Sequence, residues 1–210
     1  MKRSRLFPAR IVALALLGAI VLAGCGALSS GDDPTPGPSP TPLPGTVLDP
    51  PKDLEDFTLT DQAGDPLSLS DLRGEAVVMF FGYTHCPDIC PTTIADFKRV
   101  KADLGDDASK VAFVFVSVDP DRDTPGHLAT YLGNFDPDFI GITGDELTLR
   151  GIAQQFGVFF QRSNYDESGD NYLVDHTAST FVVGPEGRLR IVYPYDTDPS
   201  IIADGIRKLL

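Results

Sequence analysis

The sequence predicts an α/β fold, a sandwich in which a central mixed sheet is flanked by helices, and three observations support that class. Two continuous apolar runs, residues 76–81 and 111–118, are typical of strands that are buried on both faces. Segments with the helical spacing of apolar residues alternate with these runs, as in sheets whose parallel strands are connected by helices. Residues 180–193 have the pattern of an antiparallel hairpin, so the sheet is expected to be mixed.

The predicted domain runs from residue 53 to residue 210 and has an ordinary size for a single domain. Lys101 interrupts the apolar stripe of its first helix. The turn Gly184-Pro185-Glu186-Gly187 separates the two strands of the hairpin. In chain order, we expect strands at 57–60, 67–69, 76–81 and 111–118, helices near 91–104, 127–135 and 147–156, hairpin strands at 180–183 and 189–193, and a last helix at 199–210.

Residues 1–24 have the order of a secretory signal peptide, with a positively charged start and an apolar run over 11–23. The run ends in Leu-Ala-Gly followed by Cys25, which resembles a bacterial lipobox and implies cleavage before Cys25 and lipidation of its thiol. The alternative is an uncleaved membrane helix, but the apolar run is shorter than the roughly 20 residues that span a bilayer. We therefore expect a bacterial lipoprotein, anchored on the extracytoplasmic face of the cell membrane.

Residues 25–52 are expected to be the lipidated cysteine followed by a Pro-rich, disordered linker. Its run of alternating prolines at 34–42 predicts an extended spacer with a rise of about 3.1 Å per residue. The whole chain has a formal net charge of −13, from 17 basic and 30 acidic residues. That balance would repel the phosphates of nucleic acid, so no nucleic-acid partner is expected. A simpler role of the acidic surface is to keep the domain soluble.

Cys86 and Cys90 are the two thiols that remain when Cys25 carries lipid, and they are the most informative residues of the chain. They follow a predicted buried strand and open a predicted helix, where free N–H groups lower the pKa of a thiol. At a spacing of four residues on a helix, both side chains would project to the same side. Such a pair can bind a soft metal ion or act as a redox-active dithiol. A dithiol at the end of a central strand is also where a thioredoxin-like fold has its active site.

The ligand count favours copper over other metals that thiolates bind. A structural zinc site has four ligands and an iron–sulfur cluster usually has four cysteines, whereas this chain offers two free thiols and three histidines. Copper tolerates a smaller set, so two sulfurs and one imidazole suffice. His176, just before the predicted hairpin, is the candidate third ligand. We expect His85 to lie beside the site or in solvent, and His127 to lie on the surface.

Three separate motifs resemble the Sco/SenC family over about residues 53–210. The resemblance implies a thioredoxin-like fold that binds one copper ion, as Cu(I) or Cu(II), through Cys86, Cys90 and His176. It also implies a metallochaperone that delivers copper to the binuclear copper A centre of cytochrome c oxidase subunit II, with that subunit and other copper carriers as partners. The motifs are Gly-Tyr-Thr-His-Cys-Pro-Asp-Ile-Cys-Pro at 82–91, Ser-Val-Asp-Pro-Asp-Arg-Asp-Thr-Pro at 117–125 and Asp-His-Thr at 175–177.

Two acidic residues of these motifs are expected to act near the metal. Asp119 corresponds to the acidic position of the family's second motif, and we expect it to support the ligands or to dock a partner. Asp175 precedes the candidate ligand His176 and is expected to act in the same way, as is His85 if it stays near the thiols.

The main alternative is an enzyme, an extracytoplasmic thiol–disulfide oxidoreductase that reduces client cysteines. Redox thioredoxins typically have Trp-Cys-x-x-Cys and a proline before the hairpin, but this chain has no tryptophan and has Thr-Ala-Ser-Thr at 177–180. A peroxidase would need a threonine-containing cysteine loop and a supporting arginine, for which Arg122 is only a partial analogue. A purely structural disulfide is also disfavoured, because so small a loop restrains the unfolded chain little. The chaperone and reductase roles are compatible with each other.

Overall fold

The computed structural model describes residues 45–163 and 171–210. The predicted signal peptide, Cys25 and most of the predicted linker lie outside the described residues. The four α-helices are α1 (Ile89–Leu104), α2 (Pro125–Gly133), α3 (Glu146–Phe156) and α4 (Pro199–Arg207), with two short 3-10 helices at Leu69–Leu72 and Gly105–Lys110. The strands are β1 (Thr46–Lys52), β2 (Thr58–Asp61), β3 (Pro66–Ser68), β4 (Ala76–Gly82), β5 (Val111–Ser117), β6 (Ile140–Thr143), β7 (Phe160–Ser163), β8 (Leu173–His176), β9 (Thr180–Val183) and β10 (Leu189–Tyr193).

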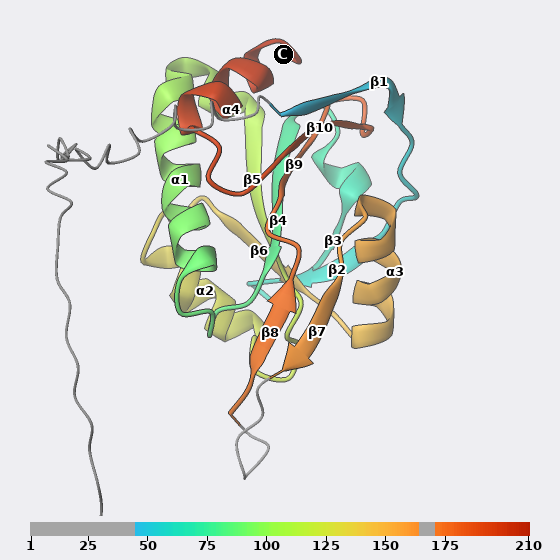
Figure 1. Cartoon of the computed structure of the whole chain (residues 1–210), viewed down its shortest axis with the longest axis vertical. Coiled ribbons are helices and arrows are strands. Elements are labelled where there is room, and N and C mark those ends of the chain that lie inside the picture. Colours follow the sequence, from blue (N-terminus) through green and yellow to red (C-terminus); the bar gives the residue numbers. More distant parts are fainter. Residues whose placement is uncertain (1–44, 164–170) are drawn as a thin grey trace, which may run out of the picture. The chain divides into compact units, whose positions relative to one another are not determined.

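Eight strands form one mixed sheet in the order β1-β10-β9-β4-β5-β6-β2-β3. In Figure 1, α1, α2 and α4 lie on one side of this sheet and α3 lies on the other. Strands β4, β5 and β6 are parallel, while β9, β10 and β1 continue the sheet with antiparallel pairing. The predicted α/β sandwich with a central mixed sheet is therefore confirmed.

The two central strands are fully buried, as their apolar sequences predict. Every residue of β4 and β5 is buried, because helices cover both faces of the sheet there. The two strands pair in register from Ala76 and Val111 to Gly82 and Ser117. Their carboxyl ends therefore lie side by side, and the segments that follow them start from neighbouring points at one edge.

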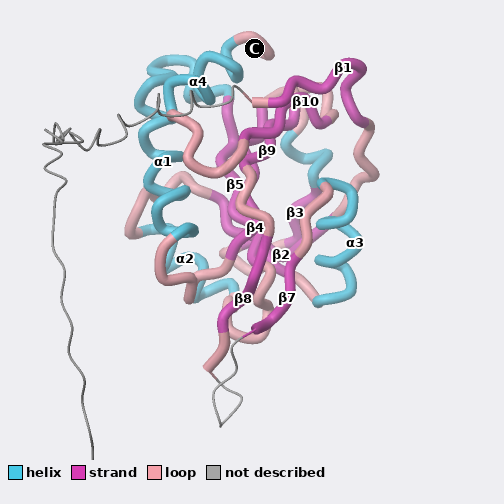
Figure 2. Tube along the Cα trace, in the orientation of Figure 1, coloured by secondary structure: helices cyan, strands magenta, loops and turns pink. Residues whose placement is uncertain are grey.

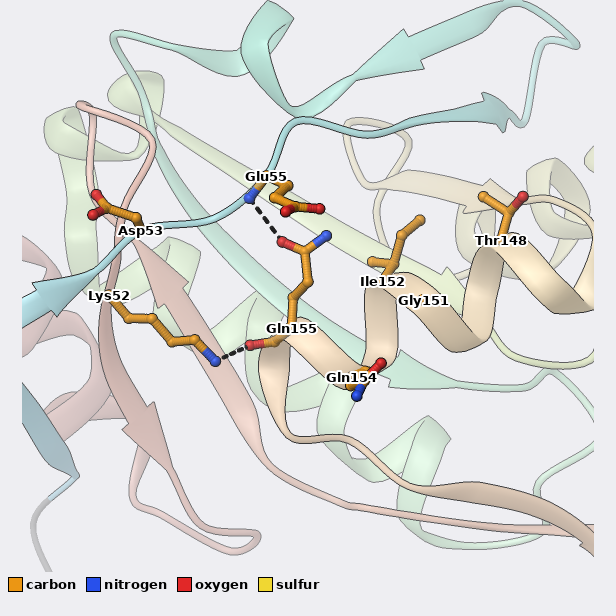
Figure 3. Close-up of a pocket in the computed structure, with 8 residues that line it drawn as sticks. All are labelled: Lys52, Asp53, Glu55, Thr148, Gly151, Ile152, Gln154 and Gln155. Carbon is orange, nitrogen blue, oxygen red and sulfur yellow. Dashed lines mark hydrogen bonds between the residues drawn. The ribbon is translucent and has the colours of Figure 1, made fainter.

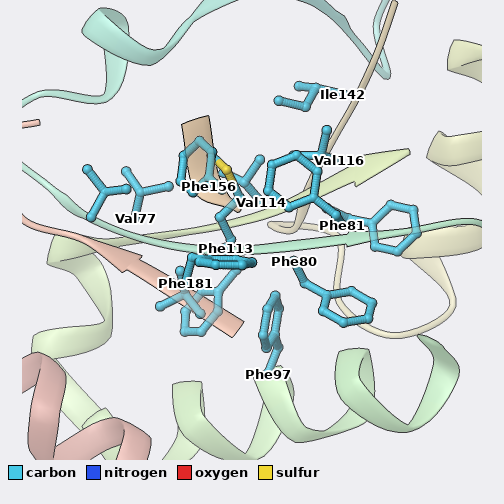
Figure 4. Close-up of a cluster of buried hydrophobic side chains, with 14 of the residues drawn as sticks. Val77, Phe80, Phe81, Phe97, Phe113, Val114, Val116, Ile142, Phe156 and Phe181 are labelled. Carbon is cyan, nitrogen blue, oxygen red and sulfur yellow. The ribbon is translucent and has the colours of Figure 1, made fainter. Parts of the chain in front are cut away.

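Aromatic side chains fill the core on both faces of β4 (Figure 4). Phe81 packs on Phe156 of α3, with ring centroids 5.3 Å apart. On the face toward α1, Phe97 packs on Phe113 with centroids 5.6 Å apart. Burial of one such ring stabilises a fold by roughly 1.5–3 kcal/mol. This packing fixes the strand that leads into the cysteine segment.

The first strand and two internal elements differ from the sequence-based expectation. β1 begins at Thr46, inside the segment expected to be a disordered linker through residue 52, and it pairs with β10. That boundary was wrong because the hydrogen bonds of an edge strand come from a partner far along the chain. β6 and the pair β7–β8 were not predicted at all. Figure 2 shows β7 and β8 beside each other, and they form a separate two-stranded sheet.

Within residues 45–163 and 171–210, no helix has both the length and the apolar character of a membrane span.

Candidate metal centre

The two cysteines approach each other through a turn, because only one of them lies on the helix. α1 begins at Ile89, so Cys90 is in its first turn while Cys86 precedes it. The expectation that both cysteines share the first helical turn was wrong. The backbone N–H of Cys86 bonds to Tyr83 O at 3.3 Å, and the N–H of Cys90 donates to Cys86 Sγ at 3.4 Å. The turn therefore folds back far enough for a helix N–H to point at the first sulfur.

Gly82 makes room for the second sulfur. A Cβ at this position would lie 2.9 Å from Cys90 Sγ and 2.8 Å from the Phe80 ring, closer than packed atoms approach. The glycine at the end of β4 is thus required by the close approach of the thiol to the strand. Cys90 itself is 0% exposed, whereas Cys86 is half-buried.

His176 presents one ring nitrogen to the thiols. Its Nε2 lies 3.4 Å from Cys90 Sγ, and its Nδ1 lies 3.1 Å from Thr177 O. A carbonyl oxygen can only accept, so Nδ1 carries the hydrogen and the lone pair of the neutral ring is at Nε2. Metal-binding histidines are commonly oriented by such a bond. The ring is also packed edge to face against Phe80 and Tyr83, with centroids 5.7 Å and 5.9 Å away.

The structure brings together the three candidate ligands that the sequence singled out. Sγ of Cys86, Sγ of Cys90 and a ring nitrogen of His176 all lie within 4.8 Å of one another. Metal–sulfur and metal–nitrogen bonds of about 2.3 Å and 2.0 Å would require only small side-chain shifts to bring all three atoms onto one ion. His176 is the last residue of β8 rather than part of a loop, so the hairpin backbone sets its position.

The two thiols ionise in very different ranges. The hydrogen bond between the sulfurs lowers the pKa of Cys86, and the backbone N–H groups of Asp88 and Cys90 act in the same direction. The same bond raises the pKa of Cys90, and complete burial raises it further. The half-buried Cys86 is therefore the thiolate of the pair, and it is also the sulfur that a second molecule can reach.

Asp119 supports the histidine hairpin from inside the protein. Its side chain is 0% exposed, which favours the supporting role over the docking role that the sequence also allowed. Tyr172, just before β8, donates to Asp119 Oδ1 at 2.6 Å, and Arg122 Nε donates to Asp119 Oδ2. The Arg122 guanidinium also lies 3.6 Å from the centre of the Tyr172 ring. This cluster holds the hairpin against the loop that follows β5.

Asp123 is a buried carboxylate that sequence reasoning missed as part of the site. It accepts from Thr84 N at 2.9 Å and from Thr84 Oγ1 at 2.6 Å, which holds the cysteine segment. It also accepts from Ser117 Oγ at 2.6 Å, at the end of β5. In the sequence Asp123 is one more acid in an acidic motif, and no local pattern shows that it is buried while Asp121 is exposed.

The remaining candidates lie outside the three-ligand group. Asp175 is exposed on β8 and is paired across the hairpin with Gln161. His85 has a side chain that is 44% exposed and stacks on His127, with ring centroids 5.4 Å apart and an angle of 17°. The prediction that His127 lies on the surface is confirmed, but its contact with His85 was not foreseen.

Two cavities differ in their relation to the thiols. One of about 300 Å³ is lined by Tyr83, Cys86, Ile89, Leu173 and His176 among others, so it opens onto the site. Another, of about 600 Å³, lies where the chain after β1 meets α3 (Figure 3). No cysteine or histidine lines the second cavity, and its Gln155 binds neighbouring backbone and side-chain groups. Of these two cavities, the first offers room for a partner beside the candidate ligands.

A dithiol at the end of a central strand, faced by an imidazole from a hairpin, defines a thioredoxin-like protein whose site suits a soft metal. The SCO1/SenC family model matches residues 48–210, and this chain belongs to that family. The match starts inside β1, in agreement with the structure and earlier than the predicted domain boundary. The expected family and the thioredoxin-like fold are both confirmed.

Relatives and solved structures agree with the family assignment. A SCO2-like protein of Rickettsia felis is 36% identical over 152 residues, which are 72% of this chain and 74% of the relative. Bradyrhizobium japonicum ScoI, solved with copper bound, is 35% identical and superposes with a TM-score of 0.68, covering 74% of this chain and 98% of that one. Apo Sco1 of Thermus thermophilus is 42% identical, with a TM-score of 0.71 and coverage of 80% and 97%.

Proposed function

We propose that this protein is a copper metallochaperone that binds one copper ion through Cys86, Cys90 and His176 and delivers it to the copper A centre of cytochrome c oxidase subunit II. The observation that carries the proposal is the lone pair of His176 Nε2, held 3.4 Å from Cys90 Sγ by the bond from Nδ1. The copper-bound ScoI of Bradyrhizobium japonicum supports copper as the ion. The client and the delivery step come from the family resemblance.

The donor set fits both oxidation states of copper. Two thiolates and a neutral imidazole carry a charge of −2, so the site would be singly negative with Cu(I) and neutral with Cu(II). The soft thiolates favour Cu(I), and the imidazole is also a good ligand for Cu(II). Neither state requires a further charged ligand from this chain.

Release of the ion would begin at Cys86. This sulfur is half-buried and is the better-ionised thiol, whereas Cys90 is enclosed. A client thiolate in the adjoining 300 Å³ cavity can approach the ion from that side and replace Cys86 first. Cys90 and His176 would hold the ion until the client supplies a second ligand. Each step exchanges one ligand for another, so the ion is never released into water.

The tether proposed with this function depends on the part of the chain that precedes β1. Cleavage before Cys25, lipidation of its thiol and the Pro-rich segment would place the domain at the extracytoplasmic face of the cell membrane, within reach of a membrane-bound oxidase. Lipid labelling of the wild-type chain and of Cys25→Ser in a bacterial host tests this part separately. Equal labelling of the two proteins would contradict it.

The copper proposal is tested by metal uptake and transfer. Reduced protein should bind close to one Cu(I), and the Cu(II) form should show a sulfur-to-copper charge-transfer band. His176→Ala should weaken Cu(I) binding more than about tenfold, because a ligand that is already oriented is lost. His127→Ala is the matched control and should leave Cu(I) affinity unchanged. A colourless Cu(II) form would contradict ligation by the thiolates. An equal loss of Cu(I) affinity in the two variants would contradict ligation by His176.

Delivery needs its own measurement. Incubation of the copper-loaded protein with the soluble domain of subunit II should produce copper A absorption, through an adduct that contains both proteins and one copper ion. A copper chelator that competes for free ions should not slow the transfer. If the chelator abolishes it, the ion passes through solution and the proposed exchange is wrong.

A second candidate function, thiol–disulfide exchange, is favoured by the state of Cys86. A half-exposed thiolate beside a buried thiol is the arrangement of an attacking and a resolving cysteine. The test is catalytic turnover on a mixed disulfide of subunit II with glutathione, with a small-molecule dithiol supplied to reduce the Cys86–Cys90 disulfide after each cycle. Multiple turnovers by the wild-type protein, retained in His176→Ala, would favour the reductase over the chaperone.

A further inference from the structure

Two histidines and a buried aspartate form a second cluster next to the cysteine segment. His85 belongs to that segment, whereas His127 is in the first turn of α2, whose N-cap is Thr124. The two rings are stacked, with centroids 5.4 Å apart and an interplanar angle of 17°. One ring nitrogen of each histidine and one carboxylate oxygen of Asp123 all lie within 4.8 Å of one another.

The bonds of Asp123 leave one oxygen able to take another partner. Oδ2 accepts from Thr84 N and Ser117 Oγ, whereas Oδ1 accepts only from Thr84 Oγ1 among the contacts of the described residues. A carboxylate oxygen has two lone pairs, so Oδ1 retains one. The ring of His85 lies on that side, with Nδ1 3.7 Å from Oδ1. The carboxylate is also fixed in place, because its other bonds tie two strands' ends together.

The histidines approach this carboxylate from the solvent side. Both are exposed, while Asp123 is 0% exposed beneath them. Thr84 Oγ1 lies 3.1 Å from His85 Nδ1 and limits the rotation of that ring. Water can therefore complete the coordination of an ion that the two imidazoles and the carboxylate share. The donor set contains nitrogen and oxygen and no sulfur, in contrast to the neighbouring thiol site.

We propose that His85, His127 and Asp123 form a second metal site that binds a divalent ion of borderline softness, Cu(II) in preference to Zn(II). Imidazole suits both ions, and the general order of affinities for such ligands places Cu(II) first. Bonds of about 2.0–2.2 Å place two ligand atoms of one ion at most about 4.4 Å apart, so the observed cluster needs only a small contraction. His127 can supply it, because its exposed side chain can move without disturbing the core.

The site is tested in a full chain that has no thiols. Replacement of Cys25, Cys86 and Cys90 by serine removes the sulfur ligands of the first site. This variant should bind one Cu(II), with an electron paramagnetic resonance spectrum of nitrogen and oxygen ligands and no charge-transfer band. Adding His127→Ala should weaken Cu(II) binding at least about tenfold, since the site then loses one of its two imidazoles.

His176→Ala in the same thiol-free background is the matched control. Cu(II) affinity and spectrum should stay as in the thiol-free parent, because His176 belongs to the other site. A loss of binding with His176→Ala, or an unchanged affinity with His127→Ala, overturns the proposal. Zn(II) provides a second readout, since it should shift the imidazole nuclear magnetic resonances of His85 and His127. Shifts of His176 in their place would also overturn it.

Discussion

The thiols and the imidazole of the proposed copper site belong to two regions that are built very differently. The cysteine segment lies between β4 and α1, and β4 pairs on both sides with strands that are themselves buried. The histidine lies at the end of β8, in a two-stranded sheet with four residues in each strand. The two cysteines are therefore positioned by the central sheet, whereas the histidine is positioned by a hairpin.

The hairpin is attached to the rest of the protein by side-chain contacts and not by pairing with the eight-stranded sheet. Phe160 and Val174 are buried, Tyr172 donates to the carboxylate of Asp119, and the Tyr83 ring packs against the ring of His176. A two-stranded sheet is only marginally stable by itself, so these contacts decide where the imidazole sits. The site can therefore loosen on the histidine side while the dithiol keeps its geometry.

The largest expected difference between the two regions is in hydrogen exchange. Amides of β7 and β8 should exchange about 1000-fold faster than those of β4, because local opening of a hairpin exposes far less surface than opening of the central sheet. Addition of copper should slow exchange in β8 through binding to the closed form, with little change in β4. Mass spectrometry of peptic peptides measures both. Equal protection of the hairpin and the central sheet would contradict the claim that the hairpin opens more easily.

Within the cysteine segment, the two thiols should differ at least about 100-fold in alkylation rate. Because its pKa is lowered, Cys86 is a thiolate at neutral pH, and its rate with iodoacetamide should change little between about pH 7 and about pH 9. The buried Cys90, whose pKa is raised, should react only after unfolding. Peptide mapping identifies the alkylated residue. Preferential labelling of Cys90 would reverse the proposed roles of the two sulfurs.

The same pKa shifts give the sign of the pH dependence of stability. For Cys86 the folded pKa is lowered, so its stabilising contribution is complete above the unfolded value near 9.0 and is lost as the pH falls through the folded value. For Cys90 the folded pKa is raised, so its contribution is complete below the unfolded value near 9.0 and decreases as the pH rises above it. Because the same bond between the sulfurs causes both shifts, Cys86→Ser and Cys90→Ser should each weaken both slopes, as measured by chemical denaturation at a series of pH values.

Gly82→Ala tests the core side of the site. The added methyl group would contact Cys90 Sγ and two aromatic rings at less than 3.0 Å, so the free energy of unfolding should fall by about 2 kcal/mol and copper affinity should fall with it. Gly151→Ala in α3 is the matched control, because no atom lies within 4 Å of its added Cβ. That variant should be more stable by roughly 0.5–1 kcal/mol. Chemical denaturation with and without copper distinguishes the two.

Tyr172→Phe tests the hairpin side with the smallest expected change. Loss of the 2.6 Å hydrogen bond to the buried Asp119 carboxylate should cost about 1.5 kcal/mol of unfolding free energy and speed up exchange in β8. Copper affinity should fall by less than about tenfold, since His176 itself is intact. Tyr195→Phe at an exposed position is the control and should change neither quantity. An effect confined to β4 amides would contradict the supporting role of Tyr172.

Much of the fold could be predicted from local patterns, because a buried strand has a continuous apolar sequence. The apolar runs of β4 and β5 and the turn of the β9–β10 hairpin were predicted at nearly their observed positions. β1 and the β7–β8 hairpin were not, because their sequences are short or mixed and their partners are distant. Lys101, an apparent flaw in a helix stripe, proves to bind Asp136 and Asp138, which no local pattern could indicate.

The sequence by itself determined the identity of the proposed metal ligands, because two cysteines beside a strand end and one histidine before a hairpin are chemically distinctive. The tertiary structure decided how those ligands are held: which thiol is enclosed, which ring nitrogen faces it and which carboxylate is buried. It also brought His127 to His85, over a separation of 42 residues. The physical reason is that ligand chemistry resides in single side chains, whereas distance, burial and ionisation depend on neighbours that only folding supplies.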